Sequence, residues 1–223
     1  MASKLASHKV AIIGLGGTGS YVLDLVAKTH VQEIHLFDGD RFHQHNAFRA
    51  PGAPALEELT NPYKVDYFAG IYSKMRHGIV PHPYRVTQEN VQDISEFGFV
   101  FICIDKPESK EPILGGLFSA NVPFIDAGMD VQQKNGFLFG QCRTTYCTPS
   151  MSEHVKGRIS FGAGQANDIY ASDIQVADLN ALNATLAVIR WKKHFGFYVD
   201  QGQEINSVYI IGTNGMTRSV AAE

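Results

Sequence analysis

A glycine-rich turn between an apolar strand and a helix is the feature of this sequence that most restricts its fold. Residues 9–13 read KVAII, a continuous apolar run typical of a strand buried on both faces of a parallel sheet. The run GLGGTGS follows at residues 14–20, and residues 21–27 then have the apolar spacing of a buried helix. A second short strand at residues 34–37 completes a βαβ unit of about 30 residues. The first part of the chain is therefore predicted to form parallel strands covered by helices.

Strand and helix patterns alternate through the rest of the chain. We predict helices at residues 64–76, 111–120 and 178–194, and strands at residues 78–86, 97–104, 122–126, 136–146 and 207–211. No helix is expected before the first strand, and residues 219–223 are expected to fray. The sequence predicts an α/β fold with a Rossmann-like, mostly parallel, mixed sheet flanked by helices. Residues 1–223 are expected to form a single domain with a mobile crossover loop at residues 148–175.

Composition excludes several classes of protein. The net charge of the 223-residue chain is −3 and it has no dense basic run, so we expect neither a nucleic-acid nor a membrane-surface partner. Its longest apolar stretches are shorter than the roughly 20 residues that span a bilayer. Its three cysteines, Cys103, Cys142 and Cys147, are too few for a disulfide scaffold, so a reducing, cytoplasmic setting is expected.

The glycine turn and the acid after the second strand indicate a nucleotide site. Backbone N–H groups of a glycine turn and of the following helix can hold a phosphate, and the glycines that would do so are Gly14, Gly16, Gly17 and Gly19. Asp38 ends the second strand, where an acidic residue binds ribose hydroxyls in dinucleotide-binding folds. The alternatives are a turn that needs small residues only for packing, or a site for a nicotinamide or flavin cofactor.

The polar residues that follow Asp38 favour ATP over a hydride-transfer cofactor. Asp40, Asn46 and Arg49 continue the pattern D-x-D-x5-N-x2-R. Carboxylates can hold Mg²⁺, an amide can contact phosphate or ribose, and arginine can bind a phosphate through two parallel hydrogen bonds. A hydride-transfer site has no physical need for this cluster, whereas a triphosphate with its metal ion does.

These stretches together resemble the ThiF/MoeB group, the adenylating domain of ubiquitin-activating enzymes and their bacterial relatives, here in a minimal form. The matching segments are residues 10–20, 34–49, 101–105 and 121–126. The resemblance implies attack by a C-terminal carboxylate on the α-phosphate of ATP, which gives an acyl-adenylate and pyrophosphate. It also implies roles for single residues: Asp38 on the ribose, Asn46 on phosphate or ribose, Arg49 and Lys64 on the transition-state charge, and Asp105 on Mg²⁺.

The same resemblance implies the partners. The acyl substrate would be a small ubiquitin-like or sulfur-carrier protein with a Gly-Gly tail, handled by a homodimer. The activated tail would pass as a thioester to Cys147 and on to a conjugating enzyme, or would react directly with a sulfur or amine donor. The alternatives are adenylation of a peptide or a modified nucleoside, a non-catalytic partner subunit of an activating enzyme, and a nicotinamide oxidoreductase.

The sequence departs from the family in two respects. It has no C-x-x-C pair, so we expect no structural zinc, and a Cys/His site that includes His154 is the remaining alternative. It also has no predicted N-terminal helix carrying the arginine that relatives insert into a partner's ATP site. Cys147 lies in a C-T segment followed by the Glu153-His154 pair, as in ubiquitin-type activators, and the alternative is a bystander thiol.

Overall fold

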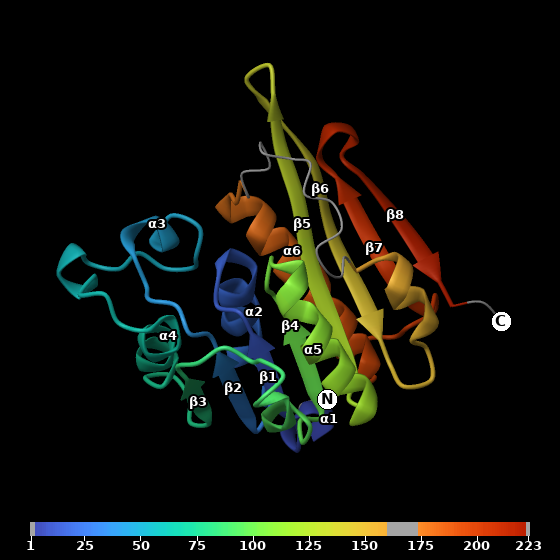
Figure 1. Ribbon diagram of the computed structural model, residues 1–223, viewed down its shortest axis with the longest axis horizontal. Helices are drawn as coiled ribbons and strands as arrows, with labels where there is room; N and C mark the ends of the chain where they lie inside the picture. The colour runs from blue at the N-terminus through green and yellow to red at the C-terminus, as the bar shows by residue number, and fades with distance from the viewer. Residues whose placement is uncertain (1–2, 160–173, 222–223) are drawn as a thin grey trace.

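Eight strands form one mixed sheet in the order β3-β2-β1-β4-β5-β6-β7-β8 (Figure 1). The computed structural model describes residues 3–159 and 174–221. The strands are β1 (Lys9–Ile13), β2 (Glu33–Phe37), β3 (Ile79–His82), β4 (Phe99–Ile102), β5 (Phe124–Lys134), β6 (Phe137–Cys147), β7 (Glu204–Ile210) and β8 (Gly215–Val220). The α-helices are α1 (Ser3–Ala6), α2 (Gly17–Ala27), α3 (Gln44–Ala47), α4 (Lys64–Tyr72), α5 (Pro107–Ser119) and α6 (Ala177–His194). The 3₁₀ turns are η1 (Leu56–Glu58), η2 (Val91–Ile94), η3 (Glu153–Gly157) and η4 (Ile211–Thr213).

The sheet changes from parallel to antiparallel at β5. The pairs β3–β2, β2–β1, β1–β4 and β4–β5 are parallel, and the pairs β5–β6, β6–β7 and β7–β8 are antiparallel. The predicted α/β class with a mixed sheet is confirmed. The strands β2 and β4 lie on opposite sides of β1, so the chain connections to them diverge at the carboxyl end of β1. Open α/β sheets bind ligands where the connections diverge in this way, at the carboxyl ends of the strands.

Alternate residues of the central strands pack on opposite faces of the sheet. Val10 and Ile12 of β1 pack with α2, α4 and α6 in one core cluster. Ala11 and Ile13 pack with α5, η2 and η3 in the second cluster. Since the parallel strands are covered on both faces, their sequences are continuous apolar runs rather than alternating ones.

The long hairpin of β5 and β6 differs from the prediction. The strand predicted at residues 122–126 is longer in the structure, where β5 continues to Lys134 and pairs with β6 over its whole length. Asn135 and Gly136 have positive φ angles of 52° and 82°, which suits a two-residue turn between twisted strands. An Asn-Gly dipeptide is a strong hairpin signal, so this sequence feature could have predicted the extension.

Several ends of elements also differ from the prediction. A single helical turn, α1, precedes β1 where no helix was expected, and α5 begins at Pro107 rather than at residue 111 because proline is favoured in the first turn of a helix. The strand predicted at residues 78–86 is shorter in the structure, where β3 ends at His82. The tail expected to fray from residue 219 pairs with β7 up to Val220. Residues 160–173 of the predicted mobile loop lie outside the described residues, and its described part contains η3, whose Val155 is fully buried.

The glycine turn is held together by a very close backbone contact. Gly14 has a φ of +89°, a conformation that strains any residue with a side chain. A Cβ on Gly19 would lie 1.9 Å from the carbonyl oxygen of Gly14. Both glycines are therefore required for packing α2 directly onto the end of β1.

We expect Gly19→Ala to reduce the free energy of unfolding by about 2–3 kcal/mol, because the added methyl group forces the helix away from the turn. Gly70→Ala is the matched control, since a Cβ on this exposed glycine of α4 meets no atom within 4 Å. Alanine at position 70 should stabilise the helix by about 0.5–1 kcal/mol. Urea denaturation of both variants measures the difference, and equal stabilities would contradict the packing role of Gly19.

Candidate functional site

A cavity of about 460 Å³ opens at the carboxyl ends of β1, β2 and β4. We call it the Asp38 cavity. Its walls come from the glycine turn, the loops after β2 and β4, the start of α5 and the segment after β3. The predicted site residues among its lining are Gly14, Gly16, Asp38, Asp40, Arg49, Lys64 and Asp105. The fold therefore gathers most of the predicted site residues, which lie far apart in the sequence, around one space.

Asp38 links the end of β2 to the glycine turn. Its carboxylate is 9 % exposed and accepts the backbone N–H of Leu15 at 2.7 Å and that of Asp40 at 2.8 Å. These two bonds fix the turn after β1 and the start of the polar loop relative to each other. The carboxylate keeps one edge at the cavity, where it can accept ribose hydroxyl groups.

Lys64 and Arg85 both contact Asp40. The Lys64 ammonium lies 3.1 Å from one Asp40 oxygen and 3.8 Å from Asp38, and the Arg85 guanidinium lies 2.6 Å from the other Asp40 oxygen. Partial burial by itself would raise the pKa of Asp40, but the hydrogen bonds from Arg85 and Lys64 outweigh it and hold the pKa below its usual value. The cluster presents two fixed cations to the cavity.

Arg49 and Asn46 are placed differently by the short helix α3. Arg49 lines the cavity, and its Nε is buried with no hydrogen-bond partner among the described residues. An unpaired buried donor of a cation suits an anionic ligand. Asn46 is 4 % exposed and accepts the backbone N–H of His43 at 2.9 Å as part of the α3 cap, and it does not line the cavity. Its predicted contact with phosphate or ribose stays a prediction.

The glycines also divide into two groups. Gly14 and Gly16 line the Asp38 cavity, and Gly16 leaves open space where a side chain would be. Gly17 instead contacts Asn180 of α6, where a Cβ would lie 2.0 Å from the amide nitrogen, and Gly19 packs on Gly14. Packing therefore explains Gly17 and Gly19, and Gly14 is both required for packing and part of the cavity lining.

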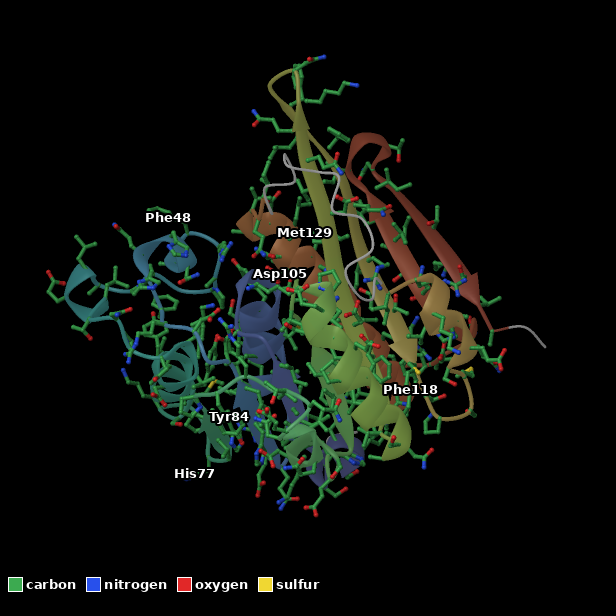
Figure 2. The ribbon with its side chains drawn as sticks, viewed as in Figure 1. Phe48, His77, Tyr84, Asp105, Phe118 and Met129 are labelled. Atoms are coloured by element: carbon green, nitrogen blue, oxygen red, sulfur yellow. The ribbon has the colours of Figure 1, made fainter. Side chains whose placement is uncertain are left out.

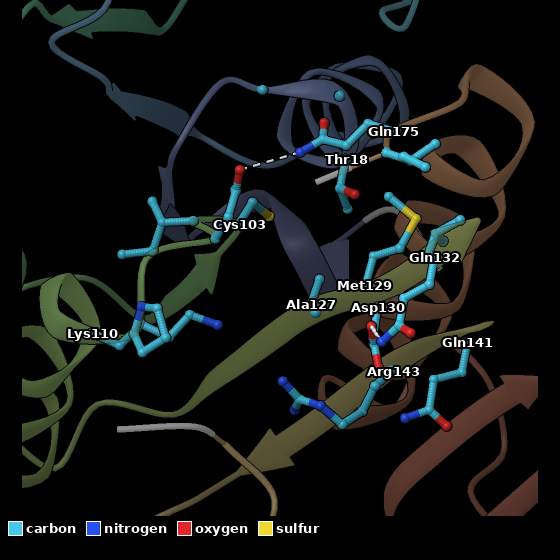
Figure 3. Close-up of a pocket in the computed structure, with 18 of the residues that line it drawn as sticks. Thr18, Cys103, Lys110, Ala127, Met129, Asp130, Gln132, Gln141, Arg143 and Gln175 are labelled. Carbon is cyan, nitrogen blue, oxygen red and sulfur yellow. Dashed lines mark hydrogen bonds between the residues drawn. The ribbon is translucent and has the colours of Figure 1, made fainter. Parts of the chain in front are cut away.

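A second cavity of about 360 Å³ lies along β5 and β6, and we call it the trough (Figure 3). It shares five lining residues with the Asp38 cavity: Gly16, Cys103, Ile104, Asp105 and Gln175. The Gln175 amide donates to the Asp105 carboxylate at 3.2 Å across this shared wall. The trough continues away from Asp105 past Gly128 toward Gln132 and Gln141 of the β5–β6 hairpin. The two spaces therefore meet at Asp105.

Cys147 lies at the end of the sheet opposite to the glycine turn, near the amino ends of the parallel strands. It pairs with Phe124, the first residue of β5, whereas the glycine turn follows the carboxyl end of β1. Figure 2 shows the same separation between Asp105 and Phe118, and Phe118 and Cys147 line another cavity together. The thiol is 1 % exposed, and burial raises its pKa to about 12.

His154 does not face the Cys147 thiol as a general base would. Its Nε2 lies 2.8 Å from the Tyr146 carbonyl oxygen, and the Cys147 thiol donates to the Thr148 carbonyl oxygen at 3.6 Å. Burial also lowers the pKa of His154. This geometry favours the bystander alternative in the described conformation, so the transfer role of Cys147 stays a hypothesis. No group of three or more His, Cys, Asp or Glu side chains within the described ranges could hold a metal ion.

Sequence reasoning missed several residues that line the two cavities. Arg85 follows an edge strand with no motif around it, and Gln175 lies in an aperiodic segment before α6. Lys110 and Arg143 lie on α5 and β6 and reach the trough only because these elements pack on β5. No local pattern marks any of these four residues, since their role depends on long-range packing.

A sequence-family model identifies the family of this chain. The model of the family described as the ThiF family matches residues 2–152, which is more than half of the chain. The chain belongs to the ThiF family. The predicted resemblance is therefore confirmed at the level of the family, and the match covers every lining residue of the Asp38 cavity except Gln175.

Proteins of low sequence identity are similar to this ThiF family chain. It is 26% identical over 150 residues to ubiquitin-like modifier-activating enzyme 5 of Drosophila mojavensis, a match that covers 60% of this chain and 37% of the relative. The crystal structure of E. coli MccB with succinimide matches at 18% identity with a TM-score of 0.77. This match covers 98% of the present chain and 65% of the MccB chain. The structure of E. coli MccB with MccA-N7isoASN has 17% identity, a TM-score of 0.79 and coverages of 98% and 66%.

These structures show that the fold is shared. Selenomethionine PaaA is a further solved structure with this fold, at 14% identity, a TM-score of 0.76 and coverages of 98% and 65%. The chain therefore spans just over a third of the fly relative and about two thirds of the MccB and PaaA chains.

No described helix has the length and apolar character that crossing a membrane requires.

All three cysteines of this ThiF family chain should be inert in the native protein at pH 8. Each is buried, and burial raises the thiol pKa to about 12 for Cys147 and to about 11 for Cys142, and it also raises the pKa of Cys103. Because only the thiolate reacts, we expect native labelling by a disulfide reagent at least about 100-fold slower than in urea. Rapid native labelling of Cys147, located by mass spectrometry, would contradict this and support its transfer role.

Proposed function

We propose that the protein adenylates the C-terminal carboxylate of a polypeptide with ATP. The single observation that carries the proposal is that the Asp38 cavity and the trough meet at Asp105. An adenylation site needs a nucleotide and an acyl chain in contact at the α-phosphate, and two separate cavities that share one wall provide this arrangement. Ubiquitin-like or sulfur-carrier proteins with a Gly-Gly tail are the first candidate substrates.

ATP would occupy the Asp38 cavity. Asp38 would accept the ribose hydroxyls, and the open position at Gly16 lets the backbone and the N-terminus of α2 approach the phosphates. Arg49, with its unpaired buried Nε, and Lys64 would hold the phosphate chain. Arg85 would keep Asp40 neutralised as part of this cationic wall.

The reaction forms one bond and breaks one bond at the α-phosphorus. A carboxylate oxygen attacks it, the bond to the bridging oxygen of pyrophosphate breaks, and pyrophosphate leaves with the electron pair. Negative charge grows on the leaving phosphates during this step. Cations fixed beforehand by Asp38, Asp40 and the protein core stabilise that charge without reorganisation, which is the main electrostatic contribution available to this site.

Asp105 fits a role in binding Mg²⁺. It is a carboxylate at the junction of both cavities, and Mg²⁺ is held in such sites by one or two carboxylates together with phosphate oxygens and water. When bound, Mg²⁺ would neutralise phosphate charge. The Gln175 amide would orient the Asp105 carboxylate through the hydrogen bond between them.

A peptide is the second candidate substrate. The structural neighbours include the microcin C7 biosynthetic enzyme MccB in complex with N-formylated MccA, and the trough would admit a peptide end as well as a protein tail. Transfer through Cys147, a conjugating enzyme, a homodimer and a cytoplasmic setting belong to this proposal as further expectations. A non-catalytic subunit is disfavoured because Asp38, Arg49, Lys64 and Asp105 all line one cavity.

We expect the purified protein to catalyse ATP–pyrophosphate exchange that depends on Mg²⁺ and on a polypeptide substrate with a free C-terminus. Arg49→Ala should reduce the exchange rate about 100-fold or more, because a fixed cation at the developing charge is lost. Arg218→Ala, which removes an exposed arginine of β8, is the matched control and should keep the wild-type rate. Cys147→Ala should also retain exchange.

Two results would contradict the proposal. ATP binding without exchange for any carrier protein or peptide would indicate a non-catalytic subunit. Preferential binding of NAD(P), with tolerance of Arg49→Ala, would indicate an oxidoreductase instead. Exchange with a peptide but with no Gly-Gly carrier would select the second candidate substrate.

A further inference from the structure

A buried carboxylate with two cations forms part of the wall of the trough. Asp126 of β5 is 0 % exposed, and its Oδ1 lies 2.7 Å from the Lys110 ammonium while its Oδ2 lies 2.6 Å from the Arg143 guanidinium. The carboxylate itself does not line the trough, but both cations do. Figure 3 shows Lys110 from α5 and Arg143 from β6 pointing toward one another. The positive groups of this triad therefore face the trough, and the negative group lies behind them.

The charge of the triad is unbalanced. One buried carboxylate requires one cation for neutrality, and here it has two, so the triad carries a formal charge of +1. The side chains of Lys110 and Arg143 are 6 % and 17 % exposed, so this excess charge is poorly solvated. An uncompensated charge in such a place costs stability unless an anion can approach it. Arg158 lines the same trough, and so do the carboxylates Asp105 and Asp130, so the excess positive charge belongs to the triad and not to the trough as a whole.

Both cations retain hydrogen-bond donors for a ligand. Within the described ranges, the side-chain hydrogen bond of Lys110 goes to Asp126, which leaves two of its three N–H groups. Arg143 donates to Asp126 and to the Thr145 hydroxyl, and it has three further N–H groups. A carboxylate, which offers two oxygens and several lone pairs, suits this donor set.

The triad lies close to the junction of the two cavities. Lys110 is in the first turn of α5, a 13-residue helix that begins two residues after Asp105. The partial positive charge of this helix end adds to that of the lysine. An anion held here is therefore next to the wall that the trough shares with the Asp38 cavity.

We propose that Lys110 and Arg143, held by Asp126, form a subsite that binds the terminal carboxylate of the acyl substrate before it reacts. The inference rests on the proposed function and deepens it, because it names the group that selects a free C-terminus over an amidated or internal one. The two cations offset the repulsion between the substrate carboxylate and the phosphates of ATP. Arg49 and Lys64 act on the phosphate side of the junction, and Lys110 and Arg143 act on the acyl side.

The test compares two synthetic decapeptides that end in Gly-Gly, one with a free carboxylate and one with a carboxamide. Each is titrated calorimetrically into the full chain with a non-hydrolysable ATP analogue. We expect the wild-type protein to bind the free acid at least about 10-fold more tightly, as is reasonable for a charge-assisted contact. Lys110→Met, which leaves Asp126 neutralised by Arg143, should reduce this preference below about threefold.

A double variant that restores the net charge of the triad distinguishes an effect on carboxylate binding from an effect on folding. Lys110→Met combined with Asp126→Asn again has a net charge of +1, and the preference should return toward the wild-type value. Lys28→Met is the matched control, since it removes a surface lysine paired with Asp24 at 2.6 Å and should leave the preference unchanged. Thermal melts of all variants verify that each is folded.

The outcomes distinguish this subsite from the proposed function. Equal or undetectable affinity of the wild-type protein for the two peptides, or a preference that Lys110→Met does not reduce, would overturn the subsite. A charge-dependent preference without ATP–pyrophosphate exchange would support the subsite and contradict adenylation. Exchange with no such preference would leave adenylation standing and remove the subsite.

Discussion

The hydrogen bond from the Leu15 N–H to the Asp38 carboxylate is the contact on which the whole site depends. It joins the turn after β1 to the end of β2, and a second bond from Asp40 fixes the polar loop to the same carboxylate. Lys64 then approaches Asp38 and Asp40 because its backbone N–H bonds to the Asp40 carbonyl oxygen at 2.9 Å. One buried carboxylate thus orients both the glycine turn and the cations opposite it.

The change from parallel to antiparallel pairing at β5 gives the site its second half. A parallel sheet alone would end in loops at this edge, but the β5–β6 hairpin continues past the ends of β1 and β4 (Figure 1). Its strands form the floor of the trough, with Gly128 packed beneath the Arg143 guanidinium. The Asp38 cavity is thereby a product of the parallel strands, and the trough is a product of the antiparallel ones.

Each of the two cavities also has its own set of cationic side chains. Arg49, Lys64 and Arg85 face the Asp38 cavity, while Lys110, Arg143 and Arg158 face the trough, and Asp105 lies between them. In the proposed reaction two anionic substrates would repel each other at short range, so joining them would need fixed cations on each side. Cys147, at the other end of the sheet, takes no part in this arrangement in the described conformation.

The sequence by itself determined the βαβ unit, the α/β class, and the seven predicted site residues that line the Asp38 cavity. These are local properties: apolar runs, a glycine turn, and polar residues at fixed offsets from Asp38. It did not determine that Gly17 and Gly19 serve packing, that Asn46 caps α3, or that Cys147 is remote from the turn. Only the tertiary structure placed Lys110 and Arg143 around Asp126, because their juxtaposition depends on how α5 and β6 pack against β5. Side chains brought together from distant segments leave no local pattern, so the triad of Asp126, Lys110 and Arg143 is visible only in the fold.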